Sequence, residues 1–403
     1  MDFTPTEEQR AARDLAAEVF GDLATPERLA ELGPSADAAL WKALCAAGLP
    51  GAAEETGLLG LVLMLEEQGR TTAQVPFAAS CVYGLLALGA HGSEEQRARL
   101  LPGLRDGTEV ATGAFTRGRG LGVVARGGWD GSLGAAVRAR LTGVVPVVPW
   151  LCAATLLLVP DAERRLWLVR TGDPGVGVEP VATTAPWSAG RLTLDGAPAE
   201  ALGDGPVAAP PVAGPAPARP VDGSSPTPPL ADPDRAPTPY DDILATARTA
   251  FAGLQAGVCA GALARAVAHT TTREQFGRPL AANQAVQLRA AEAYMDTEAI
   301  RVTAYEAAWR RDAGLPAGTH ALTAAWWASE AGKRVVHTGQ HLHGGLGADL
   351  DHPVHRHFLW GRQLDAHLGA GAELLEELGE LLTNPTERTR LTEPTDPTKE
   401  PQA

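Results

Sequence analysis

The stretch Arg273-Glu-Gln-Phe-Gly-Arg-Pro-Leu280, followed closely by Asn283 and Gln284, decides how the second half of this chain is organised. Its glycine and proline interrupt two long segments with helical apolar periodicity, which predicts a tight joint between two antiparallel helices. Two arginines lie at this joint, and each guanidinium is able to bind a phosphate through two N–H donors. Phe276 adds a flat apolar surface. This combination fits an adenine dinucleotide diphosphate, whereas the alternative that needs no ligand is a salt-bridged helical corner.

The joint resembles the acyl-CoA dehydrogenase family, whose members carry R-x-Q-F-G-R-P before a long antiparallel helix. Two N-terminal phrases also resemble this family, namely Met1-Asp-Phe-Thr-Pro-Thr-Glu-Glu-Gln-Arg10 and Gly92-Ser-Glu-Glu-Gln-Arg-Ala-Arg-Leu-Leu-Pro102. The resemblance implies FAD as the cofactor, bound across a subunit interface. The residues that it assigns to FAD at this joint are Arg273, Gln275, Phe276, Asn283 and Gln284.

Composition limits the possible partners and the location of the chain. Its 403 residues are enough for two or three domains and a sizeable core. A formal charge of −14 argues against nucleic acid and anionic membrane surfaces as partners. Four widely spaced cysteines without a C-x-x-C pair predict free thiols in a reducing compartment. We therefore expect a cytoplasmic protein, and no secretory signal pattern is visible.

The pattern of the chain predicts a mainly α, α+β fold with three domains. Residues 1–107 are expected to form an N-terminal helical domain, and residues 108–202 a small antiparallel β-barrel or sandwich. The apolar run at 141–160 is interrupted by prolines, so we interpret it as buried strands rather than a membrane span. Three further segments are expected: a disordered Pro/Ala-rich linker insertion at 203–240, a C-terminal four-helix bundle at 241–382, and a disordered tail at 383–403.

Individual elements follow from the same patterns. A capping box is predicted at Thr4-Pro-Thr-Glu7 and a second one at Ser93-Glu-Glu-Gln96. The helices predicted for the bundle are Ile243–His269, Ala285–Trp309, Ala321–Val336 and a single last helix from Pro353 to Leu382. The strands predicted for the middle domain are Ala136–Thr142, Ala154–Val159, Leu166–Val169 and Arg191–Leu194.

A second informative phrase is Gln340-His-Leu-His-Gly-Gly-Leu-Gly347. Paired glycines let a backbone approach a diphosphate closely and turn amides toward it. The phrase resembles the family's Q-x-x-G-G-x-G turn, which contacts FAD bound across the subunit interface, although a histidine stands where most members have the glutamine. The residues that this resemblance assigns to FAD are Gln340, His341, Gly344 and Gly345. The longer phrase from His337 to Trp360 resembles one branch, the heteromeric acyl-CoA dehydrogenases of steroid side-chain breakdown.

Two other patterns carry less weight. Glycines 118, 120 and 122 stand where the family has its flavin loop, but no helix start follows them, so we do not favour a phosphate cradle there. Seven of the ten histidines lie between His337 and His367. No cysteine or carboxylate ligand pattern accompanies them, so we predict capping and surface histidines and no metal site.

The catalytic base is the decisive question. Desaturation of an acyl thioester requires a carboxylate that removes the α proton. The family places its glutamate at one of two positions, and Leu368 and Ala247 occupy the matching positions here. Neither side chain accepts a proton, so we predict no catalytic residue in this chain. Asp365, one helical turn before Leu368, is the alternative base, but we favour a structural role for it.

These observations favour the base-less subunit of a heteromeric acyl-CoA dehydrogenase. The resemblance implies that such a subunit pairs with a glutamate-bearing sister in a heterotetramer. The expected substrate is an acyl-CoA, possessing a steroid side chain or another bulky acyl group, and the expected electron acceptor is an electron-transfer flavoprotein. Two alternatives remain open, a flavin oxygenase on the same fold and a non-enzymatic assembly subunit.

Overall fold

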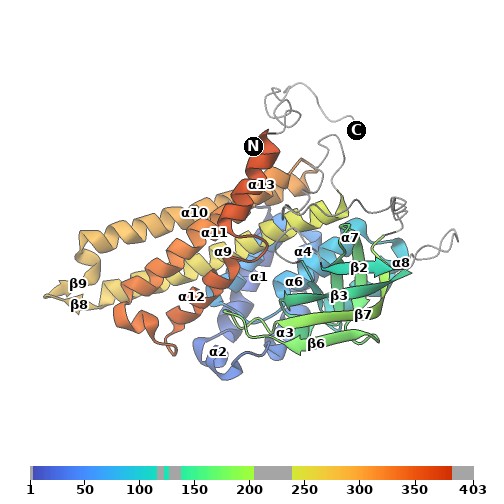
Figure 1. Cartoon of the computed structure of the whole chain (residues 1–403). Coiled ribbons are helices and arrows are strands. Elements are labelled where there is room, and N and C mark those ends of the chain that lie inside the picture. The colour runs from blue at the N-terminus through green and yellow to red at the C-terminus, as the bar shows by residue number, and fades with distance from the viewer. Residues whose placement is uncertain (1–2, 116–121, 127–137, 204–237, 384–403) are drawn as a thin grey trace, which may run out of the picture.

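The computed structural model describes residues 3–115, 122–126, 138–203 and 238–383. Most of the segments predicted as linker and tail lie outside these residues, as do Gly118 and Gly120. Helices at the start of the chain pack beside a β-sheet, and a bundle of long helices extends away from that sheet (Figure 1). The division into an N-terminal helical part, a small β part and a C-terminal helical part confirms the predicted fold class.

Short and medium helices form the N-terminal part. The helix α1 begins after Thr6, whose hydroxyl accepts a hydrogen bond from the Gln9 backbone while the Gln9 side chain accepts one from Thr6. The capping box predicted at Thr4 is therefore wrong by two residues, whereas the box at Ser93 and Gln96 is confirmed. The elements are α1 (Glu7–Leu23), α2 (Pro26–Leu32), α3 (Ala38–Ala46), α4 (Leu49–Glu55), α5 (Gly57–Thr71), α6 (Phe77–Ser80), the π-helix η1 (Cys81–Leu86), α7 (Ala87–His91) and α8 (Glu94–Asp106).

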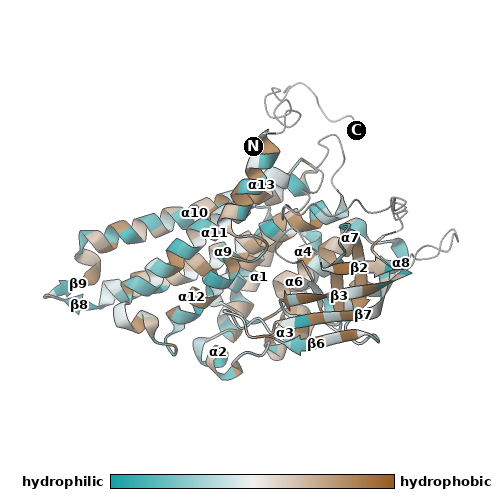
Figure 2. Ribbon diagram, in the orientation of Figure 1, coloured by the Kyte–Doolittle hydropathy of each residue, from teal (hydrophilic) through white to brown (hydrophobic). Residues whose placement is uncertain are grey.

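One seven-stranded sheet forms the middle part, in the order β1-β4-β5-β7-β3-β2, with β6 also paired to β7. Each pair is antiparallel except β1 and β4, which are parallel, so the domain is not purely antiparallel as predicted. The apolar run at 141–160 lies in β3 and β4, as predicted. Figure 2 shows apolar residues along these strands. The strands are β1 (Ala111–Gly113), β2 (Val123–Arg126), β3 (Arg138–Val148), β4 (Leu156–Pro160), β5 (Leu166–Arg170), β6 (Val176–Pro180) and β7 (Gly190–Ala201).

Long antiparallel helices form the C-terminal bundle, and its last member is broken in two. Leu368 and Gly369 have φ angles of 62° and 126°, which no α-helix accommodates. The prediction of one continuous last helix is therefore wrong. The helices are α9 (Pro239–Thr272), α10 (Gln284–Asp312), α11 (Gly318–Leu342), α12 (Pro353–Leu364) and α13 (Gly371–Thr383).

The helix α9 is the central element, because it packs against α5 as well as against its bundle neighbours. Gly253, Gly257 and Gly261 recur every four residues and face α5. A methyl group at Gly257 would lie 2.0 Å from the Glu66 carbonyl oxygen, so only glycine permits this backbone approach. By length and composition α9 is apolar enough to cross a membrane, but 78% of its most apolar window is buried inside the protein. Its apolar character is therefore explained by its position in the core.

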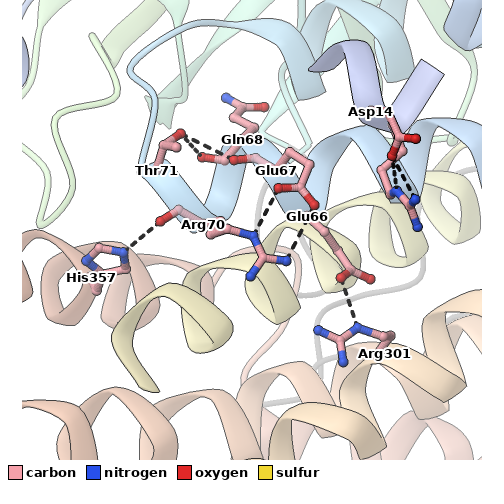
Figure 3. Close-up of polar contacts among 9 residues, drawn as sticks. Asp14, Glu66, Glu67, Gln68, Arg70, Thr71, Arg301 and His357 are labelled. Carbon is pink, nitrogen blue, oxygen red and sulfur yellow. Dashed lines mark hydrogen bonds and ion pairs between the residues drawn. The ribbon is translucent and has the colours of Figure 1, made fainter. Parts of the chain in front are cut away.

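Buried polar contacts hold α5 to the bundle (Figure 3). The Arg301 guanidinium pairs with Glu66 at 2.9 Å. His357, on α12, donates from Nε2 to the Arg70 carbonyl oxygen at 3.0 Å. Burial lowers the pKa of His357 to about 4, so this imidazole is neutral at pH 7. These contacts fix α10 and α12 relative to the N-terminal domain.

Candidate functional site

The predicted joint forms a small β-hairpin at the end of the bundle remote from the sheet (Figure 1). Its strands are β8 (Glu274–Gln275) and β9 (Arg278–Pro279). Phe276 and Gly277 form the turn with φ angles of 55° and 75°, the pattern of a two-residue hairpin turn that favours asparagine and glycine. The Phe276 side chain is 100% exposed. A large apolar ring on unfavourable backbone gains nothing here from the chain's own packing, which indicates an external contact.

Polar groups surround this hairpin. Arg273 ends α9, and its backbone N–H donates to the His269 carbonyl oxygen. Asn283 is the N-cap of α10 and accepts a hydrogen bond from Ala285, whereas Gln284 opens that helix at the surface. Among the described residues no carboxylate forms an ion pair with Arg273 or Arg278. Both guanidiniums are therefore available to a ligand, and the salt-bridged corner considered from the sequence is not what the structure contains.

The second predicted motif forms a tight turn, the 3₁₀-helix η4 (Gly344–Ala348), directly after α11. Gly344 has a φ of 61°, and a methyl group built on Gly345 would meet no atom within 4 Å. Gln340 donates from Nε2 to the Gly347 carbonyl oxygen at 3.0 Å, so this side chain braces the turn. His341 is exposed at the end of α11. The turn thus presents open backbone at its glycine pair.

Stacked histidines bring the two motifs to the same end of the bundle. The His269 and His343 rings stack with their centroids 4.7 Å apart. His269 lies one helical turn before Arg273, and His343 directly precedes Gly344. The arrangement fits an FAD diphosphate, because unpaired guanidiniums and an open glycine turn lie near each other. The individual FAD contacts of the nine residues assigned from the sequence stay predictions.

The two base positions lie elsewhere, at the junction of the bundle with the middle domain. Ala247 is completely buried and Leu368 is 7% exposed. Asp365 ends α12, where one carboxylate oxygen accepts a hydrogen bond from Ser329 at 2.8 Å. Its other oxygen pairs with Arg362 at 2.8 Å. Both oxygens are occupied by donors of this chain, which favours the structural role of Asp365.

An ion pair closes the break between α12 and α13. Arg248 binds Glu377 with two contacts of 2.9 and 2.7 Å. Its Nε also donates to the Leu368 carbonyl oxygen at 3.4 Å. The arginine that follows one base position therefore holds the backbone of the other. Leu368 itself has a left-handed backbone conformation, with a φ of 62°.

Aromatic side chains fill the space beside this break. The Trp187 ring, from the loop before β7, packs edge-on against Trp360 and His367, with centroids 5.7 and 5.4 Å away. Phe251 of α9 lies 4.4 Å from the His367 ring. Trp150 stacks on Trp187 from the other side. The region around Leu368 is therefore packed with this chain's own rings.

Comparison with known proteins identifies the class. The model of the acyl-CoA dehydrogenase N-terminal domain matches residues 6–108, and that of the acyl-CoA dehydrogenase C-terminal domain matches residues 241–379. The chain belongs to the acyl-CoA dehydrogenase family, whose members are FAD-dependent.

Similar proteins point to one branch of this family. Acyl-CoA dehydrogenase FadE27 of Mycobacterium tuberculosis is 35% identical over 400 residues, covering 94% of this chain and 98% of the relative. FadE28 of the same organism is 27% identical over 398 residues, with the same coverage. A variant of the Tcur3481-Tcur3483 steroid ACAD superposes with a TM-score of 0.79 at 38% identity, covering 93% of this chain and 98% of that one.

Further solved structures agree with this placement. The ChsE4-ChsE5 complex from Mycobacterium tuberculosis gives a TM-score of 0.79 at 31% identity, covering 95% and 99% of the two chains. Butyryl-CoA dehydrogenase from Megasphaera elsdenii gives 0.77 at 21% identity, covering 95% and 100%, and this likeness shows the shared fold. The resemblance to heteromeric steroid acyl-CoA dehydrogenases inferred from the sequence is therefore confirmed.

Sequence reasoning missed several residues at the bundle end. His269 and Arg265 lie one and two helical turns before Arg273, so helical spacing alone places them on the same face. His343 belongs to the quoted glycine phrase, but its stacking on His269 depends on the pairing of α9 with α11. His352 is confirmed as a capping histidine, because its Nδ1 accepts a hydrogen bond from Val354.

Proposed function

We propose that this chain is a subunit of an acyl-CoA dehydrogenase that lacks its own catalytic base and completes the FAD site of a sister subunit. The sister supplies the glutamate that removes the α proton of the acyl thioester. FAD, when bound, accepts the hydride from the β carbon. The contribution of this chain is to hold the dinucleotide through its hairpin and glycine turn.

The observation that carries this proposal is the contrast between the two parts of the family's chemistry. The base positions hold Leu368 and Ala247, both buried, and Asp365 is fully engaged by Ser329 and Arg362. In the dinucleotide motif, by contrast, Phe276 is exposed and Arg273 forms no ion pair with any carboxylate in the described part of the chain. A chain that contributed to neither function would have no reason to keep a strained, exposed phenylalanine.

An apolar stripe on α10 supports the need for a partner. Leu288, Met295 and Val302 recur every seven residues and are 56%, 62% and 48% exposed. A seven-residue apolar repeat along one helix is typical of a surface that packs against a second helix. Tyr294 widens the stripe and is 58% exposed. We therefore place the sister subunit on this face, in a heterotetramer that passes electrons to an electron-transfer flavoprotein.

The similar steroid acyl-CoA dehydrogenases support a steroid side chain or another bulky acyl group as the substrate. We also propose a cytoplasmic location. All four cysteines are free thiols, including the exposed Cys152. Free thiols fit a reducing compartment.

Co-expression with the sister subunit tests the proposal. The complex should contain fewer FAD molecules than polypeptide chains, and the chain expressed alone should lack FAD. Replacing the sister's glutamate by glutamine should abolish desaturation, because no base remains in any site. A homo-oligomer of this chain alone that holds FAD and desaturates acyl-CoA would overturn the proposal. A complex whose activity and FAD content do not depend on Arg273 would instead identify an assembly subunit.

A further inference from the structure

A row of imidazole rings lies behind the hairpin, and none of the sequence predictions gave it a function. It consists of His269 on α9, His343 at the end of α11 and His352 at the start of α12. The ring centroids are 4.7 Å apart between His269 and His343, and 4.9 Å apart between His343 and His352. We call these three residues the histidine row.

Hydrogen bonds fix how the row presents its nitrogens. His343 is 5% exposed and donates from Nδ1 to the Gly339 carbonyl oxygen at 2.7 Å. His352 accepts a hydrogen bond from the Val354 backbone at Nδ1, at 3.2 Å. The neutral His352 ring therefore carries its proton on Nε2, where it is a donor. His269 and His352, at the two ends of the row, are both partly exposed.

Arg265 lies beside this row without a counter-ion. It is half-buried, one turn before His269 on α9, and burial lowers the pKa of its guanidinium. Among the described residues no carboxylate forms an ion pair with it. A partly desolvated guanidinium without a partner is unfavourable, which points to a ligand that supplies the negative charge.

The charges around the row act on one another. The pKa of His352 is lowered by burial, then by His343, Arg265 and His269, while Asp349 acts in the opposite direction. The pKa of His269 is lowered by burial, then by His343 and Arg273. Burial and the neighbouring arginines therefore disfavour the protonated forms of His269 and His352. An anion bound between them would reverse this effect and raise both pKa values.

We propose that Arg265, His269 and His352 bind a phosphate group of a nucleotide. The guanidinium offers a planar pair of donors, and the imidazoles offer further N–H donors, His269 from the same helix α9 and His352 from the start of α12. A phosphate group is anionic and accepts several hydrogen bonds at once, which suits one guanidinium and two imidazole donors. Two ligands of this enzyme class carry such groups, the FAD diphosphate and the phosphates of CoA. Only the choice of FAD and CoA as ligands rests on the proposed function. The three phosphate-binding side chains all belong to this chain.

Calorimetric titration with ADP tests the site, using the full chain in the complex with its sister after removal of FAD. We expect Arg265→Gln to weaken ADP binding by roughly tenfold or more, the size of one lost charge-assisted contact. Arg289→Gln, the same change of charge at an exposed position of α10, should leave ADP binding unchanged. Equal ADP affinity in the wild type and Arg265→Gln, or no ADP binding by the wild type, would overturn the proposal.

His352→Asn is a second variant that should preserve the fold, because asparagine is a good N-cap for α12. It should weaken ADP binding severalfold with unchanged thermal stability. In the wild type, the NMR titration of the His269 and His352 resonances should move to higher pH when ADP is present, and Arg265→Gln should reduce that movement. Resonances that titrate identically with and without ADP would contradict direct contact.

The FAD-loaded complex distinguishes the two nucleotides. If the FAD diphosphate occupies the site, the loaded complex no longer binds ADP and Arg265→Gln lowers FAD retention. If CoA occupies it, the loaded complex still binds ADP and prefers CoA to 3′-dephospho-CoA, a preference that Arg265→Gln removes. If the complex held one FAD for every polypeptide chain and still bound ADP, the proposed function would be contradicted. The proposed phosphate site would remain supported.

Discussion

The two regions that carry the family's chemistry differ in how far the chain satisfies its own groups. Around Leu368, rings and ion pairs of the chain fill the space and occupy both oxygens of Asp365. At the hairpin, Phe276 is fully exposed and two arginines have no acidic partner among the described residues. The difference teaches that one chain can fill one region with its own side chains and leave exposed apolar and cationic groups in another. Under the proposed function, the filled region lacks the base and the open region contacts the sister subunit.

Removal of one aromatic ring from each region should give the largest difference in unfolding free energy between the two regions. Trp360→Ala removes a completely buried ring at the junction and should cost about 3–5 kcal/mol of unfolding free energy. Phe276→Ala removes an equally apolar ring at the hairpin and should leave that free energy nearly unchanged. Chemical denaturation of both variants measures the contrast, and similar losses in the two would break it.

The pH dependence of stability should reflect the buried junction of α5, α9 and α12. The pKa of His357 falls from an unfolded value near 6.5 to about 4 in the fold, so its contribution is complete above pH 6.5 and lost as pH falls to 4. The full loss from this group is about 3 kcal/mol, at 1.36 kcal/mol for each pKa unit. Denaturation measured across this range should show it. His357→Gln should flatten the curve, whereas His341→Gln, at an exposed position, should not.

Arg273 tests the open region. Arg273→Ala should lower FAD retention of the complex by an order of magnitude or more, since a charge-assisted contact is worth roughly 1.5–3 kcal/mol. Arg273→Lys should restore only part of this, because an ammonium lacks the planar pair of donors. Fluorescence of FAD released on dilution measures the effect. Unchanged retention in Arg273→Ala would show that this guanidinium does not hold FAD.

Asp365 tests the packed region around Leu368. Asp365→Asn should cost about 1–3 kcal/mol of stability, because the Arg362 pair and a buried hydrogen bond are weakened. It should leave α-proton exchange of a bound acyl-CoA in deuterated buffer intact. Loss of exchange in a folded complex that still holds FAD would show that this chain supplies the base after all.

The smallest effect is expected from the backbone of the hairpin. Phe276→Gly replaces a residue with φ of 55° by one that adopts this conformation freely, and should stabilise the chain by up to about 1 kcal/mol. The same change should weaken assembly or FAD retention. A variant that gains no stability while keeping full FAD content would remove the argument that the exposed ring is retained for an external contact.

Much of this architecture could be predicted from the sequence, because long helices and alternating strands follow from apolar periodicity. The break at Leu368 could not, since leucine rarely adopts a positive φ and the Arg248 side chain that contacts the Leu368 carbonyl oxygen is 120 positions away in the chain. The capping box was placed at Thr4 because proline suits the first turn of a helix, but Gln9 selects Thr6 as the cap. Local signals give elements, whereas long-range contacts decide where they end.

The hairpin arginines could likewise be found from a short phrase, but the histidine row could not. His269 is distant in sequence from His343 and His352, and the three rings meet because the ends of α9 and α11 lie beside the start of α12. Arg265 carries no signal of its own, since a lone arginine on a helix is usually solvated. That no carboxylate of the described residues pairs with Arg265 becomes visible only in the folded chain.

The three glycines of α9 that face α5, Gly253, Gly257 and Gly261, also have a consequence for synthesis of the protein. The partner surface of Gly253, Gly257 and Gly261 lies on α5, which leaves the ribosome long before α9 does. Until then the apolar α5 has no helix to cover it, so the N-terminal domain emerges with part of its core exposed. Nascent chains that stop before α9 should bind chaperones. Only translation beyond the three glycines of α9 should release the chaperones.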